Sequence, residues 1–148
     1  MIDSERTATP EAKPVVWGNV LTTHSLDSER NLWVIRLILP PGAELPYWTR
    51  PSLTTIYVES GLLIFTGVTG IVRLSRGVNP VEHTTTMTGQ PTKLAPGDTV
   101  SFSQGVQHSM YNPILTPTAI IVTMIAASAV VPYDGLWTSE GYPIQIDA

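Results

Sequence analysis

The sequence predicts a single all-β domain, folded as a sandwich or a barrel. Short runs rich in β-branched and aromatic residues follow one another from Val15 onward, and turn residues separate them at near-regular intervals. No stretch sustains the 3.6-residue apolar period of an amphipathic helix. The chain has 148 residues, 43% of them hydrophobic, which suits one domain with a core of its own.

The elements follow one another from an N-terminal arm to a C-terminal tail. Residues 1–13 are polar, and we expect a flexible arm there. The domain itself is expected over 14–131. Its predicted strands are 15–23, 31–39, 44–49, 54–59, 61–66, 70–75, 81–87, 92–95, 99–103, 107–112 and 118–127. Turn residues bound them, as in Ser28-Glu29-Arg30-Asn31, Pro40-Pro41-Gly42, Gly77-Val78-Asn79-Pro80, Gly89-Gln90-Pro91 and Pro96-Gly97-Asp98. The tail 132–148 is rich in aromatic residues, so we expect it to pack on the barrel or on a partner chain.

Composition excludes several classes of function. The chain carries 8 Lys and Arg against 12 Asp and Glu, a net charge of −4, and has no basic run, so a nucleic-acid partner is not expected. It has no Cys, which excludes disulfides, thiolate metal sites and a Cys nucleophile. The longest apolar stretch, Ala119 to Val131, is too short to span a bilayer as a helix, and the N-terminus lacks the apolar core of a signal peptide. We expect a soluble, cytoplasmic protein with no membrane partner.

Two stretches framed by glycines carry a family resemblance. In the second, Gly97, Gly105, His108 and Asn112 fall in the register of the second cupin motif, G-x5-P-x-G-x2-H-x3-N, and Ser103 replaces the proline. In the first, Gly42 and Gly61 frame the register of the first cupin motif, G-x5-H-x-H-x3,4-E-x6-G. The chain therefore resembles the cupin superfamily over roughly residues 33–127, and this resemblance implies a double-stranded β-helix, or jelly-roll barrel.

The substitutions within the first motif change the chemistry that the resemblance implies. Cupins typically hold a divalent metal with three His and one Glu, but here Trp48 and Arg50 stand at the His positions and Thr54 at the Glu position. Trp offers no lone pair, Arg stays protonated and Thr is a poor ligand. A single imidazole, His108, does not hold a transition metal at useful affinity. We therefore expect no metal and no cofactor at this site.

Strand alternation groups the remaining candidates. It places Trp48 and Arg50 on one face of their strand, and His108 with Met110 on one face of theirs. In cupins the His-bearing faces point into the barrel. The predicted ligand-binding residues are Trp48, Arg50, Thr54, Phe102, His108 and Met110. Because a buried, unpaired guanidinium is costly, Arg50 needs a carboxylate neighbour, a position at the barrel mouth or an anionic ligand.

The main hypothesis is a metal-poor cupin that binds a small anionic organic molecule inside the barrel. His108 is the candidate catalytic acid/base near neutral pH, for a lyase, isomerase or cyclase type of reaction, and whether any reaction occurs is left open.

Two alternatives stand beside this hypothesis. One is a metalloenzyme with a site rebuilt from His108 with His83 or Glu44. The other is a plugged structural or sensory cupin whose role is dimerisation. Unpaired strand edges, the aromatic tail and the low charge predict a homodimer in each case.

Overall fold

The computed structural model describes residues 15–45, 51–67, 70–77, 85–87, 89–132 and 144–147. Its strands are β1 (Val16–Ser25), β2 (Arg30–Leu39), β3 (Glu44–Leu45), β4 (Leu53–Ser60), β5 (Leu63–Gly67), β6 (Val72–Ser75), β7 (Thr85–Met87), β8 (Thr92–Leu94), β9 (Thr99–Ser103), β10 (His108–Tyr111), β11 (Thr118–Ala127) and β12 (Ile144–Asp147). All but β12 fall at strands that the sequence predicted, so the all-β fold class is confirmed.

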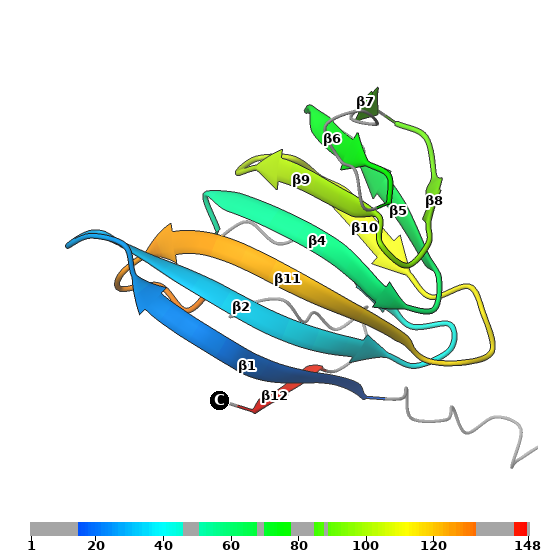
Figure 1. Ribbon diagram of the computed structural model, residues 1–148, viewed down its shortest axis with the longest axis horizontal. Helices are drawn as coiled ribbons and strands as arrows, with labels where there is room; N and C mark the ends of the chain where they lie inside the picture. The colour runs from blue at the N-terminus through cyan, green and yellow to red at the C-terminus, as the bar shows by residue number, and fades with distance from the viewer. Residues whose placement is uncertain are drawn as a thin grey trace, which may run out of the picture.

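The strands form two sheets. The larger has the order β12-β1-β2-β11-β4-β9-β6-β7, and the smaller has the order β3-β10-β5-β8. Figure 1 shows the larger sheet fanning from β1 through β2, β11, β4 and β9 to β6, with β5, β8 and β10 grouped at one end. Neighbours such as β2 and β11 are distant in sequence and antiparallel. This arrangement is that of a jelly roll, as the motifs implied.

The core lies between the inner faces of the two sheets. In β4 and β9 the buried residues alternate with outward-facing ones, as the two-residue period of a strand requires. The buried side chains that fill the core include Ile35, Leu37, Leu39, Leu45, Ile56, Val58, Leu63, Phe65, Leu94, Val100, Phe102, Met110, Ile120, Val122 and Met124. Each such side chain contributes about 1.5–3 kcal/mol through burial.

Gly61, the last glycine of the first motif, is required by a close approach between chain segments. It has a φ of +87°, and a Cβ built there would lie 2.5 Å from Oγ1 and 2.8 Å from Cα of Thr118. The Thr118 hydroxyl donates to the Leu62 carbonyl at 2.7 Å and accepts from the Leu62 N–H at 3.1 Å. The glycine thus lets the start of β11 bind the turn between β4 and β5.

Of the two terminal segments, only the C-terminal tail includes residues that the structure describes. The predicted arm 1–13 lies outside the described residues, as do the tail aromatics Tyr133, Trp137 and Tyr142. Within the tail, β12 pairs in parallel with β1 from Ile144 opposite Val16. Within the described ranges, no helix has the length and apolarity needed to cross a membrane.

Candidate functional site

The second motif folds into β9, a turn and β10. Gly97 precedes β9 with a φ of +95°, a conformation that favours glycine. His108 begins β10 opposite Gly67 of β5, and Met110 lies opposite Phe65. The sequence alternation is confirmed here, because His108 and Met110 are both buried on the inner face.

His108 is enclosed by aromatic rings. Only 2% of the residue is exposed. The Phe65 ring lies nearly parallel to the imidazole, with centroids 5.7 Å apart, and the Phe102 ring is tilted to it at 4.4 Å. The Nδ1 atom lies 3.2 Å from the Val106 carbonyl oxygen. Because a carbonyl only accepts, this hydrogen bond puts the proton on Nδ1 and leaves the lone pair on Nε2.

These surroundings set the charge of the imidazole. Burial among the rings lowers the pKa of His108 from 6.5 to about 4, and the Val106 carbonyl opposes this only in part. The ring is therefore uncharged at neutral pH. It can accept a hydrogen bond there, but it does not change charge near neutral pH as an efficient acid/base would.

The structure brings four of the six predicted ligand-binding residues together. Thr54 is buried and lies opposite Phe102 in the β4–β9 register. Phe102 contacts His108, and Met110 follows His108 on the same face of β10. The other two, Trp48 and Arg50, lie outside the described residues.

The described residues around His108 do not match the three-His, one-Glu set that the fold family implies. No cluster of three or more His, Asp or Glu occurs among the described residues. Phe65 and Phe102 offer no lone pair, and Thr54 is a poor ligand.

Glu44 does not belong to this interior. It is exposed and lies opposite the exposed Tyr111, whereas its neighbour Leu45 is buried opposite Met110. The prediction that Glu44 could join His108 in a rebuilt metal site is therefore wrong, because the two side chains are on opposite faces of the small sheet. His83, the other predicted partner, lies outside the described residues. His24 is exposed on β1.

Asn112, the last residue of the second motif, is a structural residue. Its side-chain amide donates to the carbonyls of Leu39 at 3.0 Å and Thr116 at 2.8 Å, and its carbonyl oxygen accepts from the Ile114 N–H at 3.0 Å. It is fully buried. The side chain thus ties the end of β2 to the loop that leads into β11.

Asp98, directly after Gly97, organises a turn that the sequence predicted only as a break between two strands. Its carboxylate accepts from the Ala95 N–H at 2.9 Å, the Gly77 N–H at 3.0 Å and the Arg76 guanidinium at 2.8 Å. Burial alone would raise the pKa of Asp98, but these hydrogen bonds outweigh it and the pKa is lowered. The turn therefore holds a buried, charged carboxylate.

Comparison with known proteins identifies the fold. No family model and no curated protein matches the chain. A cupin superfamily protein from Desulfitobacterium hafniense is similar in structure, with a TM-score of 0.53 and 10% identity over 81% of this chain and 85% of that one.

Two further cupin structures resemble the chain at lower TM-scores. The Cupin_2 domain of an XRE-family transcriptional regulator from Enterobacter cloacae matches with a TM-score of 0.46 and 18% identity, over 63% of this chain and 79% of that one. A Cupin 2 conserved barrel domain protein from Salinispora arenicola matches with a TM-score of 0.49 and 11% identity, over 74% of each chain. The similarity to the Desulfitobacterium hafniense protein shows that the chain has the cupin fold, as its two glycine-framed motifs predicted.

Proposed function

We propose that this chain is a metal-poor cupin that binds a small anionic organic molecule inside its barrel. One observation carries the proposal: at the interior position where the family carries its Glu ligand, a buried Thr54 lies beside Phe102 and therefore near His108. A hydroxyl and an uncharged imidazole can hydrogen-bond an organic ligand, but they are a poor set for a metal ion.

In this proposal each predicted ligand-binding residue contacts a different part of the ligand. Arg50 pairs with the carboxylate or phosphate of the ligand, since a guanidinium matches either group with two parallel hydrogen bonds. Trp48 and Phe102 provide apolar walls. His108 accepts a hydrogen bond through Nε2, because its lowered pKa of about 4 keeps the ring uncharged. Such a weak base removes protons poorly, so binding is proposed in preference to proton abstraction.

A ligand screen tests the proposal. Small carboxylates and phosphates are titrated into the protein by calorimetry, and the best ligand is repeated with Arg50→Gln and Thr54→Val. Loss of the guanidinium is expected to weaken the dissociation constant by about tenfold or more. Arg30→Gln is the control, because Arg30 is exposed and pairs with Asp27 on the β1–β2 loop. Equal binding by wild type and Arg50→Gln would contradict the proposal.

Elemental analysis separates the proposal from the remaining metal alternative. Tag-free protein, purified without chelator, is compared with His108→Ala by plasma mass spectrometry. We expect substoichiometric transition metal in both. A near-stoichiometric metal that disappears in His108→Ala would instead favour a site built from His108 and His83.

We also propose that the chain forms a homodimer through the outer face of β1, β2 and β11. Trp17 is 51% exposed on this face and lies opposite Ile38, and further apolar side chains point outward from the same strands. These are Leu32, Val34, Ile121 and Ile125. Sedimentation at micromolar concentration is expected to give the mass of two chains, and Trp17→Lys the mass of one. Leu115→Lys is the control because Leu115, 93% exposed, lies outside these strands. A single-chain mass for the wild type would exclude the dimer.

A further inference from the structure

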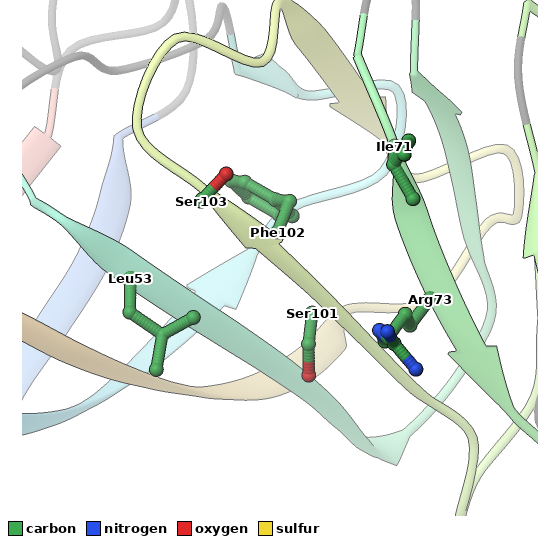
Figure 2. Close-up of a pocket in the computed structure, with 6 residues that line it drawn as sticks. All are labelled: Leu53, Ile71, Arg73, Ser101, Phe102 and Ser103. Carbon is green, nitrogen blue, oxygen red and sulfur yellow. The ribbon is translucent and has the colours of Figure 1, made fainter.

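A second candidate site lies on the outer face of the large sheet, away from the barrel interior. Figure 2 shows it as a groove across β4, β9 and β6, with Leu53 on one side of β9 and Ile71 and Arg73 on the other. Its volume is about 210 Å³, and it is lined by Leu53, Ile71, Arg73, Ser101, Phe102 and Ser103. Ser101 and Ser103 alternate with the buried Val100 and Phe102. The groove and His108 therefore lie on opposite faces of β9.

One end of the groove is polar. Arg73 lies opposite Ser101 in the β6–β9 register, and Thr55 lies opposite Ser101 in the β4–β9 register. The hydroxyls of Thr55 and Ser101 are 3.1 Å apart and share a hydrogen bond. Two hydroxyls and a guanidinium thus form one row across three neighbouring strands.

Arg73 differs from the other arginines that the structure describes. Each of the others pairs with a carboxylate, Arg30 with Asp27, Arg36 with Glu59 and Arg76 with Asp98. Within the described ranges, no carboxylate pairs with Arg73, and its side chain is exposed beside the groove. Its charge is available to an anion from outside.

The other end of the groove is apolar. Leu53 is 42% exposed and lies opposite Ser103, and Ile71 is 64% exposed just before the start of β6. A ligand that covers both side chains gains hydrophobic free energy in addition to its ion pair. Pockets for drug-sized ligands measure about 300–1,000 Å³, so this smaller groove suits a smaller molecule.

We propose that this groove binds a small amphiphilic monocarboxylate. Its carboxylate pairs with the Arg73 guanidinium and accepts from the Ser101 hydroxyl, and its short hydrocarbon part covers Leu53 and Ile71. The exposed Leu53 and Ile71 favour an anion with a hydrocarbon part over an inorganic anion such as phosphate. The two sites share Phe102, which lines this groove and contacts His108, but the groups that bind the ligand here, Arg73 and Ser101, lie on the outer face of the sheet.

An NMR titration with hexanoate tests this site. Backbone amide shifts are expected to move at Ile71, Arg73, Ser101 and Ser103, with a dissociation constant of about 1 mM, as suits an exposed ion pair with little buried area. Acetate lacks the hydrocarbon part and hexanol lacks the charge, so each is expected to bind about tenfold more weakly.

Matched variants distinguish the contribution of the polar end of the groove from that of the apolar end. Arg73→Gln is expected to weaken hexanoate binding about tenfold, whereas Arg36→Gln, on the same outer face but paired with Glu59, leaves it unchanged. Ile71→Ser is expected to weaken hexanoate binding and to leave acetate binding unchanged.

Three results would overturn the proposal. Equal binding by Arg73→Gln would remove the role of its guanidinium. Shifts centred on His108 and Met110 would assign the acid to the barrel interior. Loss of the hexanoate shifts with rising protein concentration would mean that a second copy of the chain covers the groove.

Discussion

Asp98 and His108 are ten residues apart on the same motif, both are buried, and they differ in charge. The Asp98 carboxylate accepts hydrogen bonds from two backbone N–H groups and from a guanidinium. Together these hydrogen bonds outweigh the effect of burial and lower the pKa of Asp98. His108 packs beside two phenylalanine rings that also contact each other, and there burial prevails and lowers its pKa to about 4. Burial alone therefore does not decide charge in this barrel. The hydrogen-bond donors around Asp98 keep its carboxylate charged, whereas burial without comparable compensation keeps the His108 imidazole uncharged.

Removal of the Asp98 carboxylate is expected to have the largest effect on stability. In Asp98→Ala the N–H groups of Ala95 and Gly77 lose their acceptor and Arg76 loses its partner. The free energy of unfolding should fall by about 4 kcal/mol, measured by urea denaturation. Arg76→Met, which removes only the half-exposed partner, should cost about 1 kcal/mol. Equal losses in the two variants would show that the guanidinium, and not the backbone donors, holds the carboxylate.

The pH dependence of stability should separate the two groups. The unfolded chain binds a proton at His108 near pH 6.5, but the folded chain resists it until about pH 4. The contribution of this pKa difference to the free energy of unfolding is fully present above pH 6.5. It falls by about 3 kcal/mol between pH 6.5 and pH 4. The contribution of Asp98, whose pKa is lowered, is present above its ordinary value of 3.8 and is lost below it. The free energy of unfolding is measured by denaturation across this pH range for the wild type and for His108→Phe. The difference between the two should isolate the His108 contribution between pH 4 and pH 6.5.

Replacement of His108 by phenylalanine should have a smaller effect at neutral pH. The new ring has a similar shape, lies among Phe65 and Phe102, and loses the hydrogen bond to Val106. We expect a change of less than about 1.5 kcal/mol in the free energy of unfolding at pH 7. At pH 5 the variant should be more stable than the wild type. A difference between the variant and the wild type that is the same at pH 5 as at pH 7 would mean that the imidazole is not held neutral.

The exposed ion pair of Arg36 and Glu59 should have the smallest effect. Its two hydrogen bonds, at 2.9 and 3.0 Å, are as short as those of Asp98, but both side chains are more than one-third exposed. Glu59→Gln should cost about 0.5 kcal/mol, and this cost should decrease in 0.5 M salt. A cost as large as that of Asp98→Ala would show that burial is not what separates the two pairs.

Most of the fold could be predicted from the sequence because its signals are local. Alternation and turn residues predicted β1 to β11, and the resemblance to the cupin motifs predicted Thr54 and His108 as ligand-binding residues, both of which are buried. β12 was missed because its alternation, Ile144-Gln145-Ile146-Asp147, is only four residues long and its pairing with β1 is a contact between the two ends of the sequence.

The parts of the site that were not predicted depend on contacts between strands. The lowered pKa of His108 depends on Phe65 and Phe102, which belong to two other strands. The groove depends on the registers that set Arg73 beside Ser101. Glu44 was misplaced because its face was predicted from the first motif alone, whereas its pairing opposite the exposed Tyr111 of β10 sets the direction of its side chain.

An NMR titration of the His108 ring tests the central claim, that the barrel interior holds an uncharged imidazole. The ring signal is assigned by its loss in His108→Phe and followed from pH 8 to the lowest pH at which the chain stays folded. At pH 5.5 a group with a pKa of about 4 is about 3% protonated, whereas one with a pKa of 6.5 is about 90% protonated. The account predicts a ring that is still neutral at pH 5.5. A midpoint near pH 6.5 would contradict it.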